Sequence, residues 1–180
     1  MTRIDPFDEG SRLVGWLAVA VVLLAAVVTA GAFLADPTTA TPDPVAYDDT
    51  VELGLSAETD AQMAGDATVP RAQVFYSQYQ YVVGYNGVGT LIEALERDRT
   101  DRQFGFPLVV YVSTFDGSDP TTTDDELFAA TDNPAWTPAT DAVYVVGSNA
   151  RSPAGEVVVP FADRTAATAF AADHGGEVVD

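Results

Sequence analysis

Hydrophobic and polar positions divide the chain into an apolar N-terminal run, polar connecting segments and two mixed regions. Residues 13–34 are apolar and uncharged, whereas 35–50 and 115–140 are rich in Pro, Thr and Asp. Regions 71–114 and 141–180 contain short runs of β-branched and aromatic residues, each followed by a helical spacing of apolar positions. This pattern predicts one membrane-length segment followed by an α+β domain over 51–180.

The apolar run is long enough to cross a lipid bilayer. Its 22 residues span about 33 Å as a helix, which matches a hydrocarbon core. Arg3 and Arg12 precede the run, and the next basic residue is Arg71. This bias predicts a single transmembrane anchor over 13–34, a cytoplasmic N-terminus over 1–12 and an extracytoplasmic C-terminal domain in the cell membrane.

A cleaved signal peptide is the alternative interpretation of the same run. Ala30, Gly31 and Ala32 have the small side chains of a cleavage site. The run is long for a signal peptide and its flank is weakly basic, so a retained anchor is favoured. No cysteine follows the run, which excludes a lipid anchor. Residues 35–50 are then expected to be an extended tether without a core.

The first mixed region predicts two strands, a helix and a third strand. Segments 71–78 and 79–86 form a hairpin pattern, and 106–114 is a buried-strand pattern. The helix over 87–100 places four apolar side chains on one face: Val88, Leu91, Ile92 and Leu95. Thr90 and Glu93 have the spacing of a capping box, which would lie at its start. The following segment, 115–140, is expected to be a connecting loop.

The second mixed region repeats this order. Strand patterns cover 141–149 and 155–163, and the last five residues, "GEVVD", form a third. The helix "RTAATAFAADH" lies between them, with Asp163 at its N-cap and Gly175 at its C-cap. The chain therefore predicts duplicated ββαβ units that pack together, because neither unit buries its helix face alone.

Composition excludes several classes of function. The net charge is −19, all eight basic residues are Arg, and there is no Cys and one His. Such a surface repels nucleic acid and suits a salt-rich environment, and it resembles haloarchaeal proteins. Thiolate chemistry and multi-histidine zinc sites are excluded, and no nucleophile elbow is present. We therefore expect no catalytic residues and no enzyme activity.

His174 is the one imidazole of the chain. It follows Phe170 by four residues, which places it on the apolar face in the last turn of the second helix. A protonated histidine there interacts favourably with the C-terminal end of the helix dipole. A structural role alone explains the residue, and a role as a metal ligand is the alternative.

Local sequence also resembles a known family. The segments "PRAQVFY" and "GYNGVGTLIEAL", then "AVYVVGSNARSPAGEVVVPFADRTAATAFAADHGGEVV", are similar to NosL proteins over about residues 58–179. The resemblance implies a duplicated ββαβ fold and an accessory function for nitrous oxide reductase, as a Cu(I) chaperone. It implies partners among extracytoplasmic copper enzymes or their assembly proteins.

The metal ligands implied by the resemblance are largely missing. The family's Cys-x-x-Cys-Gly-Met element corresponds to Glu58–Met63, where Met63 alone is retained. Ala154 stands in place of a later methionine, and His174 matches the histidine of the family's His-Gly-Gly ending. Soft Cu(I) prefers thiolate, thioether or imidazole donors, so Met63 and His174 are the candidate metal ligands.

Two functions remain open on the sequence. In the first, the protein is a membrane-anchored NosL-like factor for copper delivery or reductase maturation, with a depleted site. In the second, the domain retains the fold, has lost the copper ligands, and binds another extracytoplasmic protein. The distance between the Met63 sulfur and the His174 ring would discriminate between them.

Overall fold

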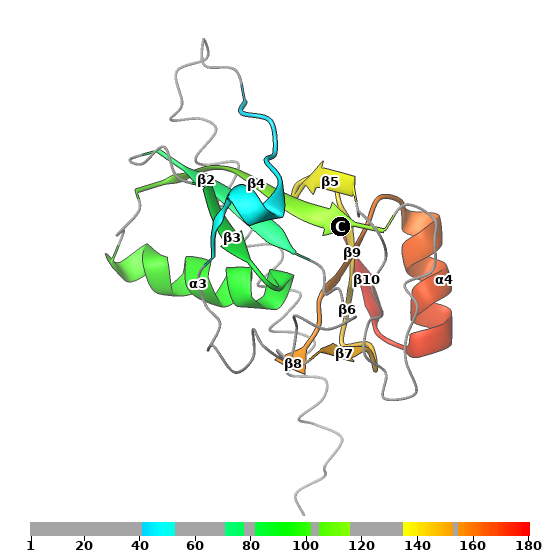
Figure 1. Ribbon diagram of the computed structural model, residues 1–180. Helices are drawn as coiled ribbons and strands as arrows, with labels where there is room; N and C mark the ends of the chain where they lie inside the picture. The colour runs from blue at the N-terminus through cyan, green and yellow to red at the C-terminus, as the bar shows by residue number, and fades with distance from the viewer. Residues whose placement is uncertain (1–40, 53–70, 78–81, 102–104, 116–134, 153–154) are drawn as a thin grey trace, which may run out of the picture.

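Two sheet–helix regions form the described part of the protein (Figure 1). The computed structural model describes residues 41–52, 71–77, 82–101, 105–115, 135–152 and 155–180. These residues form a five-stranded sheet, a three-stranded sheet, a two-stranded ladder and two α-helices. The α+β class is therefore confirmed, and the predicted transmembrane segment lies outside the described residues. Neither described helix is long and apolar enough to cross a membrane.

The five-stranded sheet has the strand order β1-β3-β2-β4-β5. Its strands are β1 (Val51–Glu52), β2 (Ala72–Tyr76), β3 (Val82–Tyr85), β4 (Pro107–Thr114) and β5 (Ala135–Pro138). Strand β2 is central and pairs antiparallel with β3 and β4, whereas β1 pairs parallel with β3. The predicted hairpin and the strand after the helix are both confirmed.

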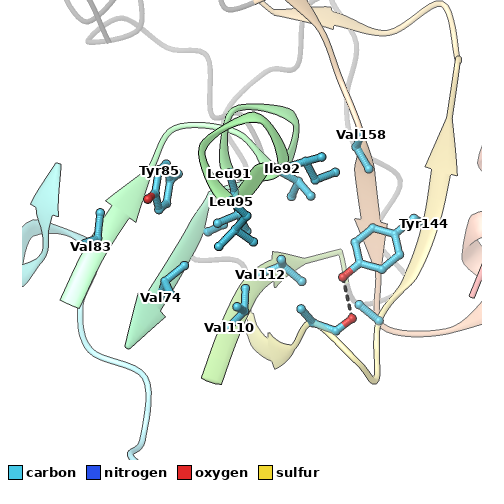
Figure 2. Packing of buried hydrophobic residues seen from close by; sticks show 14 of the residues in the cluster. Val74, Val83, Tyr85, Leu91, Ile92, Leu95, Val110, Val112, Tyr144 and Val158 are labelled. Carbon is cyan, nitrogen blue, oxygen red and sulfur yellow. Dashed lines mark hydrogen bonds between the residues drawn. The ribbon is translucent and has the colours of Figure 1, made fainter. Parts of the chain in front are cut away.

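Helix α3 (Val88–Asp101) covers one face of this sheet (Figure 2). All four apolar residues of its predicted face are buried, including Leu91, which is fully enclosed. They contact alternate residues of the strands, such as Val74 and Val110. The helix begins at Val88, so Thr90 lies inside its first turn and not at the N-cap. The expected capping box is therefore wrong.

The opposite face of the sheet is covered by residues 42–50, which we call the strap (cyan in Figure 1). The strap contains the short 3-10 helix η1 (Tyr47–Asp49) and leads directly into β1. Gln73 in β2 holds the backbone of Val45 through two hydrogen bonds. Most of the segment expected to be a free tether therefore packs against the domain, since Val45 and Tyr47 interrupt its polar sequence.

Strand β5 lies inside the segment that was expected to be a connecting loop. It pairs antiparallel with β4, and Trp136 lies opposite Ser113. The hydroxyls of Thr114 and Thr137 are 2.8 Å apart across the two strands. The loop prediction is wrong for Ala135–Pro138, because cross-strand pairing stabilises a four-residue segment whose own sequence has no strand alternation.

The three-stranded sheet has the order β10-β6-β9. Strand β6 (Val143–Val146) is central and pairs antiparallel with β9 (Val159–Phe161) and β10 (Glu177–Val179). The single strand expected over 155–163 is instead divided. Its first part, β8 (Gly155–Glu156), pairs with β7 (Arg151–Ser152), and only its later part joins the sheet.

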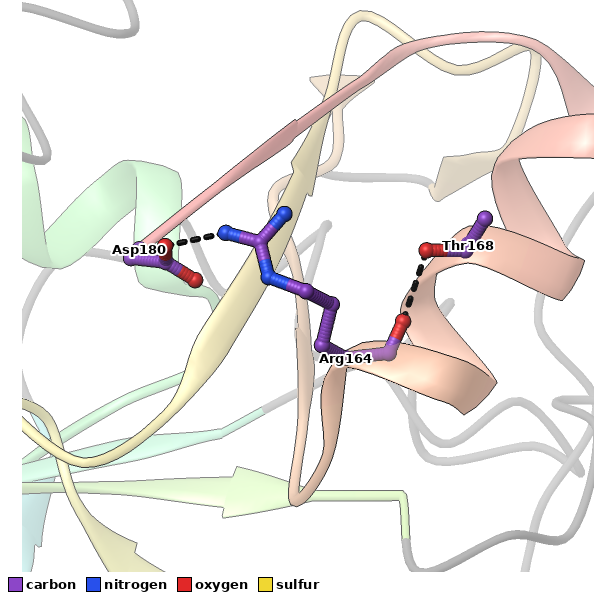
Figure 3. Close-up of polar contacts among 3 residues, drawn as sticks. All are labelled: Arg164, Thr168 and Asp180. Carbon is purple, nitrogen blue, oxygen red and sulfur yellow. Dashed lines mark hydrogen bonds and ion pairs between the residues drawn. The ribbon is translucent and has the colours of Figure 1, made fainter.

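Helix α4 (Arg164–His174) packs against the second sheet, as predicted. A surface ion pair between Arg164 and Asp180 links its first residue to the end of the chain (Figure 3). Within the helix, the hydroxyl of Thr168 donates a 2.7 Å hydrogen bond to the carbonyl of Arg164. The ion pair is exposed at both ends, so it contributes little to stability.

The two regions are joined through shared packing. Phe115, directly after β4, forms a parallel bridge with Phe161 of β9. Alternate residues of β6 face two different clusters: Tyr144 packs towards α3, and Val145 packs towards α4. Burial, with a smaller contribution from the Asp141 carboxylate, strongly raises the pKa of Tyr144. Its protonated hydroxyl donates a 2.7 Å hydrogen bond to the carbonyl of Ala139 (Figure 2).

Candidate metal centre

The candidate ligand His174 is positioned by helix α4. Asp163 caps the helix, and its carboxylate accepts hydrogen bonds from the backbone N–H groups of Thr165 at 2.8 Å and Ala166 at 2.9 Å. Ala167 and Phe170 are the buried residues of the helix. The small side chain of Ala167 and the large ring of Phe170 pack the helix against the sheet. The predicted N-cap at Asp163 is confirmed.

The ring of His174 packs against Phe170, one helical turn earlier. The two ring centroids are 4.6 Å apart and the planes are inclined by 33°. Phe170 in turn contacts Phe161 of β9, with centroids 5.3 Å apart. His174 is partly buried. The four-residue spacing therefore predicted the correct face, and an aromatic contact orients the imidazole.

The turn after His174 is fixed by two glycines. Gly175 is the C-cap, with φ 73° and ψ −173°, and Gly176 has φ 98°. A side chain on Gly176 would lie 2.9 Å from the carbonyl oxygen of Val146. The carbonyl of His174 accepts a 2.9 Å hydrogen bond from the N–H of Asn149. The end of α4 is therefore clamped to the loop that follows β6.

This loop contacts the His-Gly-Gly segment, although its sequence pattern did not predict it as part of the candidate site. The backbone N–H of Ser148 is 3.0 Å from the position a side chain would take on Gly176. Among the described residues, the buried Ser148 hydroxyl has no hydrogen-bond partner. Gly176 was the sequence signal that could have predicted this contact, because a close approach of two backbone segments requires a residue without a side chain.

The described residues do not make a closed copper site by themselves. They contain no Cys or Met, and His174 is their one imidazole. No group of three or more His, Cys, Asp or Glu side chains in this part of the chain has the arrangement of a metal site. Hydroxyl oxygen, as in Ser148, is a poor donor for Cu(I). A single imidazole needs further soft ligands to hold this ion.

Met63 and Ala154 lie outside the described residues, as do Glu58 and Ala61, which the resemblance places where the family has its two cysteines. The structure therefore does not test the distance between any of these positions and His174. The pairing of Met63 with His174 stays a prediction from the sequence.

Comparison with known proteins identifies the family. The NosL family model matches residues 56–180, which is more than two thirds of the chain. The chain belongs to the NosL family, and the matched part includes α3, α4 and the His-Gly-Gly ending. No curated protein is similar enough to match it.

Two solved structures are similar to the chain. The copper chaperone NosL from Shewanella denitrificans has a TM-score of 0.47 and 18% identity, over 63% of this chain and 76% of that protein. The apo-NosL protein from Achromobacter cycloclastes has a TM-score of 0.38 and 28% identity, over 60% of this chain and 79% of that protein. The family assignment depends on the family model and not on these structural scores.

Proposed function

We propose that this protein is a membrane-anchored, extracytoplasmic accessory factor that delivers copper for the maturation of nitrous oxide reductase. The observation that carries the proposal is the family match over residues 56–180. It is supported by the position of His174, which is oriented by Phe170 at the end of a capped helix. The copper-chaperone function named for the Shewanella relative agrees with it.

Copper is the cargo in this proposal. The His174 imidazole supplies one soft donor, and the Met63 thioether supplies the second. Two neutral donors hold Cu(I) weakly, and the thiols that would make a tight site are absent. Weak binding suits transfer, because the partner's ligands can complete and then take over the coordination. The protein carries out no catalytic step.

The second candidate function is a metal-free interaction module. One observation favours it: the packing of His174 on Phe170 accounts for the residue without a metal. In this alternative, the domain has kept the fold, has lost the copper ligands, and binds another extracytoplasmic protein. Both candidates share the anchor over residues 13–34 with the N-terminus in the cytoplasm. Both also fit a salt-adapted acidic surface of the haloarchaeal type, with a net charge of −19.

We further propose that the two sheet–helix regions are duplicated ββαβ units. In each, the first strand lies between the second and the third, and both neighbours are antiparallel. The helix connects the second strand to the third in both regions. Strands β1 and β5 and the β7–β8 ladder are then additions to this common plan.

Cu(I) titration against a competing chelator tests the function. We expect one Cu(I) to bind per chain, and we expect Met63→Ala and His174→Ala each to weaken binding by about tenfold or more. Asp173→Ala is the matched control, because this exposed neighbour of His174 offers only a hard carboxylate. Binding no stronger than background would reject the copper proposal and leave the interaction module.

A further inference from the structure

Three hydrogen bonds hold the backbone of the strap to the sheet. The side chain of Gln73, fully buried in β2, accepts a hydrogen bond from the N–H of Val45 at 3.1 Å and donates one to its carbonyl at 3.2 Å. The hydroxyl of Tyr111 in β4 donates a 2.8 Å hydrogen bond to the carbonyl of Pro42. Burial, with the nearby Asp43 carboxylate, raises the pKa of Tyr111, so the phenol remains a donor.

Tyr47 is the main side-chain anchor of the strap. It is only 8% exposed, and its hydroxyl donates a hydrogen bond to the side chain of Asn86, directly after β3. The guanidinium of Arg71 lies over the Tyr47 ring, 4.2 Å from its centroid. A cation on a partly desolvated aromatic face adds to the attraction. The strap is therefore attached at Pro42, Val45 and Tyr47, and it continues directly into β1, which pairs with β3.

Gly84 allows this close approach. It lies in β3 on the sheet face that the strap covers, opposite the α3 face. A side chain there would overlap Thr50 Oγ1 and would lie 3.0 Å from both Thr50 Cβ and Tyr47 Cε2. Thr50 cannot simply turn away, since its hydroxyl donates a 2.7 Å hydrogen bond to the Tyr47 carbonyl. A methyl group at position 84 must therefore displace the strap.

We propose that the strap is a latch that sets how far the domain can move from the membrane. The proposal rests on the anchor in the proposed function. An extended tether over 35–50 would reach at most about 55 Å. With the strap docked, only the seven residues 35–41 separate it from the proposed anchor, and their full extension is about 25 Å. Docking therefore halves the reach at which the domain meets a partner.

At low salt, electrostatic repulsion makes the two states of this latch differ in the distance between the domain and the membrane. The chain has a net charge of −19, and an anionic lipid surface repels such a domain at low salt. A released domain would move outward to the length of its tether, while the docked strap holds it near the surface. High salt screens the repulsion and reduces the difference between the two states.

Energy transfer from the domain to lipid headgroups tests the latch in the full-length chain. The chain has no cysteine, so Ala172→Cys, at an exposed position of α4, gives a single site for a donor dye. The labelled chain is reconstituted in phosphatidylcholine–phosphatidylglycerol vesicles that carry an acceptor dye on the headgroups. Gly84→Ala is compared with Gly87→Ala, whose added methyl group would make only ordinary contact, 3.4 Å from Thr90 Oγ1.

We expect Gly84→Ala to reduce energy transfer at low salt, and Gly87→Ala to leave it unchanged. In the same samples, chymotrypsin should cut after Tyr47 about tenfold faster in the Gly84 variant, because strap opening exposes that bond. Tyr111→Phe, which removes one strap hydrogen bond and leaves the sheet intact, should increase the cleavage rate by about two- to tenfold. This milder variant keeps the test valid if Gly84→Ala fails to fold.

Three results would overturn the latch. Cleavage that does not increase in either variant shows that these contacts do not hold the strap. Faster cleavage with unchanged energy transfer shows that the strap opens without setting the distance. A chain that does not float with the vesicles has no anchor, and this result alone rejects the membrane part of the proposed function as well.

Discussion

The two sheet–helix regions share a strand order but bury their second sheet face in different ways. In the first region, α3 covers one face of the sheet and the strap covers the other. In the second, α4 covers one face, and the opposite face packs against the α3 cluster of the first region. The first region therefore needs the strap, which lies outside the common ββαβ plan, to bury its second sheet face. The second region needs the first region for the same purpose.

The two helices also differ in what they bury. Four large or branched side chains of α3 enter the first cluster, among them Leu91 and Ile92. The buried residues of α4 are Ala167 and Phe170, so one aromatic ring supplies most of its apolar contact. Removal of a single side chain should therefore affect the second region at least as strongly as the first.

The largest expected effect is that of Phe170→Ala. Loss of this buried ring should lower the free energy of unfolding by about 3–5 kcal/mol, against about 2–5 kcal/mol for Leu91→Ala in α3. Denaturant unfolding followed by circular dichroism measures both. Thr168→Ala and Glu93→Ala, at exposed positions of the same helices, are the controls and should change little.

The same measurement tests whether the regions unfold together. Strand β6 contributes Tyr144 to one cluster and Val145 to the other, so both variants should retain one cooperative transition. Two separated transitions in the Phe170 variant would show that the second region is independent of the first.

A smaller effect is expected at the glycine pair after α4. Gly176→Ala should destabilise the protein by about 1–3 kcal/mol more than Gly175→Ala, because both need a positive φ but only Gly176 abuts other atoms. Comparison of the two unfolding midpoints measures this difference. Equal midpoints would mean that the His-Gly-Gly ending is not clamped to the Ser148 loop.

The smallest effect is expected at the helix cap. Asp163→Ala removes the acceptor for two backbone N–H groups and should cost about 0.5–2 kcal/mol. Asp173→Ala, at the opposite end of α4, should be neutral or slightly stabilising, since a carboxylate near a helix C-terminus is unfavourable. Thermal unfolding of the two variants gives the comparison, and equal losses would contradict the capping role.

Elements whose signals are local could be predicted from the amino-acid sequence. The β2–β3 hairpin, the buried face of α3, the Asp163 cap and the Phe170–His174 spacing all depend on residues a few positions apart, and all were predicted correctly. The family, too, was predicted from local segments and was confirmed over residues 56–180. Met63 as the second copper donor remains a prediction.

Features that depend on partners distant in sequence were revealed by the fold. Strand β5 forms because it pairs with β4. The strap is held in place because Gln73 and Tyr111 hydrogen-bond to its backbone and Gly84 leaves room for it. A polar sequence with isolated apolar residues does not predict such contacts, since the segment is stabilised by another part of the chain. The clamp on the His-Gly-Gly ending likewise requires the loop after β6, about 25 residues earlier in sequence.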